Sequence, residues 1–353
     1  MRPFLSIIVP YHDTYEDTIR LLNTIAGSVR PPVFEVIVVD DASEKSLQLT
    51  DISLQKKKRM SVRIIRMVKN KGPAAARNRG AKIARGKFLL FLDSDVEVFP
   101  DTLHNLAAIY LDDPDIVAVT GVWVKEQRNA TFFPNFKALR DWSYWINERD
   151  KSGYYFLFST RVASIKKAVF MRLGGFSESY TAALVEDIEL TYRIARRYAI
   201  IFAPNVRVRH EFESFWPIAK KYFLRAYHWT RLYRKRKKFD PVATTFQEAV
   251  TTLSAVAGLG FMGISIIVSA VTYWIISGVD PNWSLTTLRL VREVNAVIIA
   301  ASGVLLFFHF YLIRKFLVFM YNEKGFVFAL KGFFVGLVLY CFIFAGALWG
   351  RLK

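Results

Sequence analysis

Two aspartates, Asp93 and Asp95, follow an apolar segment that is typical of a buried strand. The run KFLLFLDSDVEV (87–98) carries no charge from Phe88 to Leu92, as in the central strands of a parallel sheet. If the strand continues through both aspartates, their side chains share one face about 6.6 Å apart. Two carboxylates at the carboxyl end of a strand suit a hard divalent cation that carries phosphate oxygens. The alternative is a strand that ends in a solvated aspartate turn.

A second acidic pair and one arginine stand at related places. Asp40 and Asp41 end the apolar segment FEVIVVD (34–40). Carboxylates there can accept hydrogen bonds from a ribose hydroxyl or a base N–H, although aspartate is also common in a turn after a strand. Arg77 lies on the predicted helix before Asp93 and is suited to contact a base or a phosphate. Its alternative role is a solvated charge on the helix surface.

A third group of polar residues lies further along the chain. Glu186 and Asp187 fall in the first turn of a predicted amphipathic helix (184–197), where acidic residues also favour the helix dipole. A general base must be a carboxylate held near a neutral acceptor hydroxyl, and Asp187 is our candidate. His210 ends a predicted strand, where an imidazole can complete a metal shell. A lone histidine is more often structural.

These residues are positioned by a regular alternation of strand and helix patterns over the first 120 residues. The predicted strands are 4–10, 34–40, 62–68, 87–93 and 116–124, and the predicted helices are 16–29 and 74–85. Alternation of this kind predicts an α/β fold with a doubly wound, mostly parallel sheet. Ligands of such sheets bind at the carboxyl ends of the strands, which is where the aspartates fall.

Five motifs give the sequence a resemblance to a known family. In order they are SIIVPYHD, VVDDAS, GPAAARNRGAKIARG, FLDSDVEV and VEDIELTYR. In this order and spacing they resemble the family 2 glycosyltransferases of GT-A fold, over residues 4 to about 210. The resemblance implies an inverting transfer from a nucleoside diphosphate sugar, aided by Mn²⁺ or Mg²⁺.

The resemblance also implies roles for individual residues. Nucleotide-sugar contacts are expected at Pro10, Asp40, Asp41, Arg77, Asp93 and Asp95. Asp95 is expected to bind the metal, together with Asp93 and His210. Asp187 is expected to be the general base, with Glu186 beside it in the catalytic motif. Val185 stands where the family usually has threonine, which favours the alternative of a degenerate, non-catalytic domain.

Beyond residue 210 the resemblance narrows to membrane-bound, cellulose-synthase-like members, which carry an interfacial Q-x-x-R-W motif. This chain has Arg225, His228 and Trp229 at the corresponding positions. The tryptophan is kept, whereas glutamine is replaced by arginine and arginine by histidine. Trp229 is the expected platform for the acceptor, and Arg225 and His228 can still donate to a pyrophosphate.

Three uncharged stretches, 249–279, 294–313 and 332–350, predict membrane helices of about 20 residues. We expect a transferase domain at 1–212, amphipathic interfacial helices at 213–248 and a membrane domain at 249–353. Its predicted spans are 252–277, 294–313 and 331–350. The amino terminus lacks the apolar run of a signal peptide. Basic residues at 231–238 and 314–324 therefore predict a cytoplasmic catalytic domain and a carboxyl-terminal tail outside.

Charge and cysteine content limit the remaining possibilities. The net charge is +19 and there is one cysteine, Cys341, so no intrachain disulfide is possible. The densest basic run lies beside a predicted span, which favours anionic lipid headgroups over nucleic acid as its partner. We expect a membrane-bound enzyme that moves one sugar, best GDP-mannose, to a polyprenyl- or dolichol-type acceptor in glycan or glycoprotein assembly. The alternatives are a processive polysaccharide synthase and a non-catalytic membrane protein.

Overall fold

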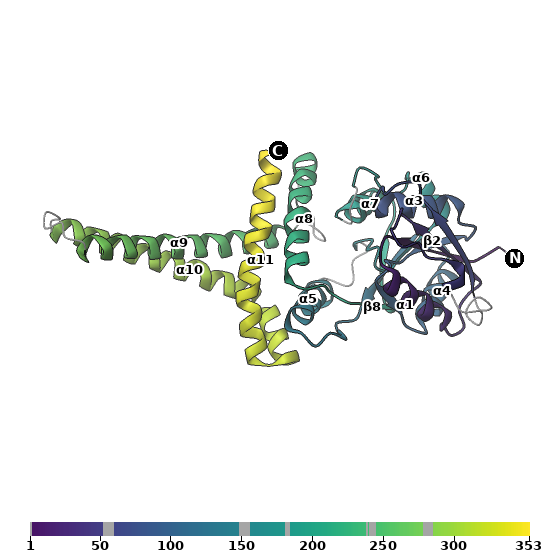
Figure 1. Cartoon of the computed structure of the whole chain (residues 1–353), viewed down its shortest axis with the longest axis horizontal. Helices are drawn as coiled ribbons and strands as arrows, with labels where there is room; N and C mark the ends of the chain where they lie inside the picture. Colours follow the sequence, from purple (N-terminus) through teal and green to yellow (C-terminus); the bar gives the residue numbers. More distant parts are fainter. Residues whose placement is uncertain are drawn as a thin grey trace. The chain divides into compact units, whose positions relative to one another are not determined.

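The computed structural model describes residues 2–51, 60–147, 156–180, 184–237, 239, 245–277 and 285–353. The chain divides into two compact units, Met1–Phe215 and Trp216–Lys353. Figure 1 shows the elements of both units along the chain. Each unit is described by itself.

The first unit is built on an eight-stranded mixed sheet with the strand order β3-β2-β1-β4-β7-β6-β8-β5. The strands are β1 (Leu5–Tyr11), β2 (Phe34–Asp40), β3 (Ser61–Arg66), β4 (Phe88–Phe91), β5 (Val96–Val98), β6 (Ala118–Trp123), β7 (Ala163–Lys166) and β8 (Ile200–His210). The four strands β3, β2, β1 and β4 are parallel, and β7 runs antiparallel to both β4 and β6. The predicted α/β sheet is confirmed.

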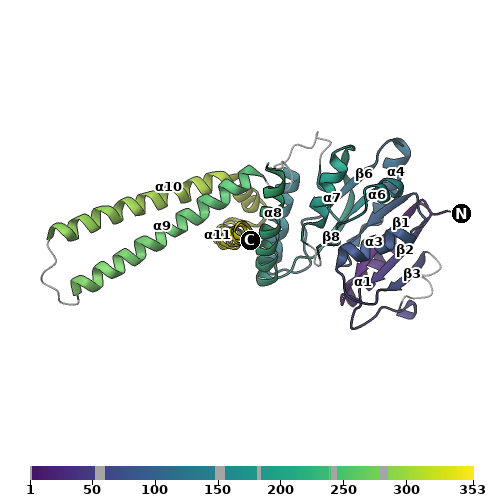
Figure 2. The ribbon, with the colours of Figure 1, turned by 90° about the horizontal axis from the view of Figure 1, so that it is seen from above.

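Helices cover both faces of this sheet, as Figure 2 shows. The helices are α1 (Tyr15–Ala26), α3 (Pro73–Ile83), α4 (Thr102–Asp112), α5 (Phe132–Trp142), α6 (Lys167–Arg172) and α7 (Glu186–Ala195), with short turns η1 (Leu49–Asp51) and η2 (Ser143–Asn147). Alternation along β1 divides the core, because Ile7 and Val9 pack with α1 whereas Ile8 packs with α3. Gly80 lets α3 approach closely, since a Cβ there would lie 2.6 Å from Ile8.

The predicted strand through Asp93 and Asp95 is wrong in one respect. β4 ends at Phe91, and a turn separates it from β5, which begins at Val96. The reason is a change of partner: β4 pairs with β1 and β7, whereas β5 pairs antiparallel with β8. Asp93 and Asp95 therefore lie in a turn and not on one face of a continuous strand.

The second unit is helical. It contains most of α8 (Phe215–Arg236), followed by α9 (Phe246–Ser277), α10 (Leu285–Lys324) and α11 (Phe326–Leu352). Among the described residues, three helical segments are long and apolar enough to cross a membrane, namely Phe246–Trp274, Thr287–Lys324 and Phe326–Leu352.

Packing inside the second unit follows two patterns. α9 and α10 run side by side, whereas α11 runs alongside α8 and across the α9–α10 pair (Figures 1 and 2). The contact between α8 and α11 depends on glycine, because a Cβ at Gly346 would lie 2.1 Å from the carbonyl oxygen of Phe223. Any larger residue there must push the two helices apart.

Candidate active site

The Asp93–Asp95 turn lies at the carboxyl end of β4. Its middle residue is fixed by the β1–α1 loop, because the Thr14 hydroxyl donates to Ser94 Oγ at 2.9 Å. The turn is closed by its own backbone, since the Val96 N–H donates to the Asp93 carbonyl at 3.4 Å. Both aspartates remain partly exposed, as groups that contact a ligand must.

Asp95 and His210 form the first candidate pair of ligands. The sheet register places His210 opposite Val96, and this brings His210 Nε2 to 3.4 Å from Asp95 Oδ2. Within the described residues, no group of three or more His, Cys, Asp and Glu side chains could hold a metal ion. A carboxylate and an imidazole nonetheless fit a cation whose other ligands are phosphate oxygens and water, as is common for Mg²⁺. Metal binding here stays a prediction.

Arg77 connects this turn with the helix that carries the candidate base. Its Nη2 donates to Asp93 Oδ1 at 2.6 Å, and its Nη1 donates to Glu186 Oε1 at 3.0 Å. The guanidinium is buried, so the alternative of a solvated helix charge is wrong. Burial disfavours the charged form, but the two carboxylates raise the pKa of Arg77 above its ordinary value. A nucleotide contact of Arg77 stays a prediction.

Glu186 and Asp187 have different surroundings at the start of α7. Glu186 is buried, and its second oxygen accepts from the Leu184 N–H at 2.9 Å. Asp187 is half-buried, and its Oδ1 accepts from the Ile188 N–H at 2.8 Å. Glu186 therefore holds Arg77 and the helix start together, and Asp187 is the carboxylate that has access to a substrate. Its role as a base stays a prediction.

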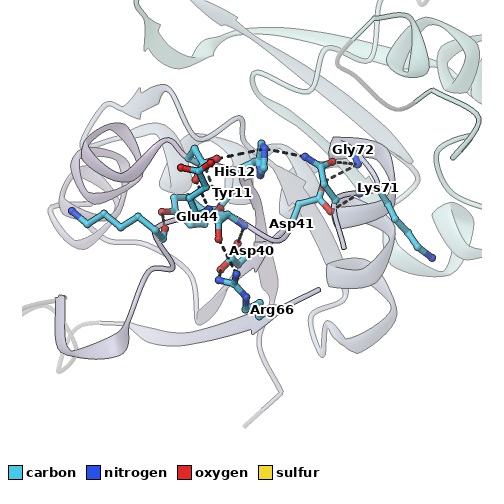
Figure 3. Close-up of polar contacts among 12 residues, drawn as sticks. Tyr11, His12, Asp40, Asp41, Glu44, Arg66, Lys71 and Gly72 are labelled. Carbon is cyan, nitrogen blue, oxygen red and sulfur yellow. Dashed lines mark hydrogen bonds and ion pairs between the residues drawn. The ribbon is translucent and has the colours of Figure 1, made fainter. Parts of the chain in front are cut away.

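The carboxylate of Asp40 organises the loop after β2 (Figure 3). Its Oδ1 accepts from the Ser43 N–H at 2.8 Å, and its Oδ2 accepts from Ser46 Oγ at 2.8 Å and from Arg66 Nη1 at 2.9 Å. Asp40 is buried. A contact from Asp40 to a nucleoside stays a prediction.

Asp41 does the same for the loop that enters α3. Its two oxygens accept from the backbone N–H groups of Lys71 at 2.8 Å and Gly72 at 2.7 Å (Figure 3). Gly72 has a φ of 86°, a conformation that favours glycine. Asp41 thereby joins the end of β2 to the start of the helix that carries Arg77. Its contact with a nucleoside also stays a prediction.

Polar residues that the sequence patterns did not single out line the same edge of the sheet. His12 is exposed just after β1, and its Nε2 lies 2.9 Å from Asn70 Nδ2 (Figure 3). Tyr11 is buried, and its hydroxyl donates to the Lys45 carbonyl. The available signal for His12 and Tyr11 was their place directly after the predicted strand 4–10. Pro10, the last residue of that strand, is half-buried and pairs with Val39 in the β1–β2 register, and its expected contact with a nucleotide sugar stays a prediction.

The motif on α8 belongs to the second unit. Arg225 and Trp229 are four residues apart and therefore share one face of the helix. In the described part of the chain, Arg225 Nε and Trp229 Nε1 are buried donors that have no hydrogen-bond partner. Burial and the nearby Arg231 lower the pKa of His228 below its ordinary value. The assignment of these three residues to pyrophosphate and acceptor stays a prediction.

Comparison with known proteins shows what the first unit is similar to. Residues 6–172 match the model of "Glycosyl transferase family 2". This part of the chain is therefore similar to the family 2 glycosyltransferases. Across the whole chain, the mannosyltransferase PcManGT from Pyrobaculum calidifontis, solved with GDP-Man and Mn²⁺, has a TM-score of 0.56 at 18% identity. That alignment covers 99% of this chain and 88% of PcManGT, and it shows a shared GT-A-like fold.

Curated relatives match parts of this chain. An uncharacterized glycosyltransferase of Haemophilus influenzae is 26% identical over 195 residues, which cover 54% of this chain and 61% of the relative. The poly(ribitol-phosphate) beta-N-acetylglucosaminyltransferase TarS of Staphylococcus aureus is 34% identical over 111 residues, which cover 31% of this chain and 19% of TarS. The chain thus spans less than two thirds of the length of these relatives.

Proposed function

We propose that the protein is a metal-dependent, inverting glycosyltransferase that adds one sugar to a lipid-linked acceptor at the cytoplasmic face of a membrane. The observation that carries the proposal is the Asp95–His210 pair, because Asp95 lies in the turn that Arg77 joins, through Asp93, to the helix of Asp187. The family match supports a sugar transfer, and the three apolar helices support a membrane-bound acceptor.

The chemistry of the proposal is a single displacement. Asp187 removes the proton of the acceptor hydroxyl as its oxygen forms a bond to the anomeric carbon. The bond from that carbon to the nucleoside diphosphate breaks on the opposite face, which inverts the configuration. Asp95 and His210, beside Asp93, would hold Mn²⁺ or Mg²⁺, which would supply Lewis acidity to the departing diphosphate.

For the donor we propose GDP-mannose, and for the acceptor a polyprenyl- or dolichol-type lipid used in glycan or glycoprotein assembly. The donor is supported by PcManGT, which shares the fold and was solved with GDP-Man and Mn²⁺. TarS, a relative over a shorter range, acts on a ribitol-phosphate polymer. Three helices are few for a polysaccharide channel, which favours the addition of one sugar over processive synthesis.

The test uses the full chain in detergent with a panel of nucleotide sugars, a polyprenyl phosphate or lipid-linked saccharide, and Mn²⁺ or Mg²⁺. We expect one donor to be consumed only when metal is present, and one sugar to be added per acceptor. Asp187→Asn should lower turnover by about 10²- to 10⁴-fold while nucleotide binding is kept. Asp95→Asn should weaken metal binding.

The matched control is Asp112→Asn, which makes the same change at an exposed site at the end of α4. It should leave turnover and metal binding unchanged. Wild-type turnover of Asp187→Asn would show that the base is assigned wrongly. If none of the nucleotide sugars in the panel is consumed, the proposed transferase function is wrong. A ladder of products with many added sugars would show processive synthesis in place of the addition of one sugar.

A further inference from the structure

A cluster of cationic and aromatic side chains lies close to the Asp95–His210 pair, within the first unit. Phe212 is its centre, because its ring contacts the His210 ring at 4.6 Å between centroids. The Lys137 ammonium lies 4.8 Å from the centroid of the same ring, and the Arg161 guanidinium lies 5.5 Å from it. One aromatic ring therefore separates the candidate metal ligands from two cations.

Strand register explains why these groups share one face. Val208 and His210 are two residues apart on β8, so their side chains point the same way. Trp123 pairs with Val208 across the β6–β8 ladder and points to that face as well. Arg161 lies over the Trp123 ring at 4.5 Å, which places its guanidinium on the side of the sheet that carries His210.

Asp141 lies between the two cations of the cluster. It forms an ion pair with Lys137 and lies 3.7 Å from Arg161 Nη2. Burial by itself would raise the pKa of the Asp141 carboxyl, but Lys137 and Arg161 lower it below its ordinary value, so this group is ionised at neutral pH. The Arg161 guanidinium faces this carboxylate beyond hydrogen-bond distance, so its N–H groups can serve a second anion.

Two donors of the cluster are available to such an anion. In the described residues the Arg161 guanidinium makes no hydrogen bond, and its side chain is 17% exposed. The indole N–H of Trp123 is buried and likewise has no partner among the described residues. A guanidinium that packs against aromatic rings presents planar N–H donors, which can form bidentate hydrogen bonds with two phosphate oxygens.

We infer that Arg161 and Trp123 form an anion subsite that binds the phosphate of the lipid-linked acceptor, an inference that rests on the proposed function. Acceptor phosphate is favoured over the donor diphosphate, because a diphosphate held at Asp95 already has its counter-charge in the metal ion. The subsite thereby places the lipid head group one side chain away from the metal pair.

The experiment measures binding of farnesyl phosphate and of farnesol to the full chain in detergent, followed by tryptophan fluorescence. The two probes differ in the phosphate alone. Wild type should bind farnesyl phosphate more tightly, and Arg161→Gln should weaken that binding about 10- to 100-fold while leaving farnesol unchanged. Arg161→Lys, which keeps a charge beside Asp141, should weaken it less because an ammonium cannot pair with two oxygens.

The matched control is Arg207→Gln, since Arg207 is an exposed arginine on β8 that pairs with Asp101 at 3.5 Å. It should leave both probes unchanged, and an equal loss in Arg207→Gln and Arg161→Gln would overturn the subsite. Binding of GDP with Mn²⁺ should be equal in wild type and Arg161→Gln. A loss of GDP binding in Arg161→Gln would assign the subsite to the donor and overturn the acceptor role.

The transferase function and the phosphate subsite can be disproved independently of each other. If wild type consumes no nucleotide sugar but prefers farnesyl phosphate to farnesol through Arg161, the subsite stands and the transferase function fails. If a nucleotide sugar is consumed and the phosphate makes no difference to binding, the function stands and the subsite is wrong.

Discussion

At the scale of single residues, Arg77 is the side chain on which the candidate site depends most. It is buried and donates to Asp93, 16 residues away, and to Glu186, 109 residues away. No pattern in the sequence links these three positions, so the predicted roles of Arg77 were a contact with a base or phosphate and a solvated helix charge. Asp93, Asp95, Asp187 and His210 were predicted because each ends or begins an element with clear periodicity.

Arg77→Met tests Arg77 as a positioning residue. The variant leaves two carboxylates without their cation and should lose about 3–5 kcal/mol of stability, measured as a lower midpoint of unfolding. Lys82→Met, an exposed lysine on the same helix, should change stability by less than about 0.5 kcal/mol. Adding Asp93→Asn and Glu186→Gln to Arg77→Met should restore stability but not turnover. Restored turnover would mean that Arg77 only stabilises the fold.

At the scale of elements, the sequence predicts what repeats locally and misses what depends on distant pairing. The first four parallel strands and the helices between them follow from alternating apolar patterns. The break between β4 and β5 does not follow from such patterns, because it depends on the pairing of Val96 with His210, more than 100 residues later. That same pairing brings Asp95 and His210 together. The two predicted ligands are therefore neighbours because of a long-range strand pairing, which local periodicity does not predict.

Glu35 gives a prediction for the opposite end of the sheet. It is buried on β2 and accepts from Ser6, Arg63 and the Arg85 N–H. Burial raises the pKa of its carboxyl, but these donors together lower it below the ordinary value. A lowered pKa stabilises the fold at pH values above the unfolded pKa, and this gain is lost as the pH falls through the folded pKa.

We therefore expect Glu35→Gln to lower the unfolding midpoint at pH 7, by an amount that corresponds to about 1–2 kcal/mol. The difference from wild type should close below about pH 4, where the wild-type carboxyl becomes protonated as well. Thermal unfolding between pH 3.5 and 7.5 measures both effects. Glu44→Gln, at an exposed glutamate, is the control without an effect. A difference that stays constant with pH would show that the charge of Glu35 contributes nothing.

At the scale of the whole molecule, the second unit changes one expectation about the membrane. Arg234, in the basic end of α8, donates to the carbonyl oxygen of Arg351 at 3.3 Å. A Cβ at Gly350 would lie 2.5 Å from the Tyr227 carbonyl oxygen, so the two helix ends are in close contact. The basic end of α8 is predicted on the cytoplasmic side. The contact therefore favours a cytoplasmic carboxyl end of α11, against the sequence prediction of a tail outside.

Thiol labelling in sealed vesicles of known orientation tests this topology. Single cysteines replace the exposed residues Arg289, Lys315 and Lys353 in a Cys341→Ser background. Arg289 and Lys315 are 26 residues apart on the continuous helix α10, or about 39 Å, which exceeds the roughly 30 Å of hydrocarbon. An impermeant reagent on the outer face should react with Arg289→Cys, and with Lys315→Cys and Lys353→Cys only after detergent is added. Labelling of Lys353→Cys from outside would show that the carboxyl-terminal tail lies on the outer face, as the sequence predicts. Equal labelling of Arg289→Cys and Lys315→Cys would mean that α10 does not cross the membrane.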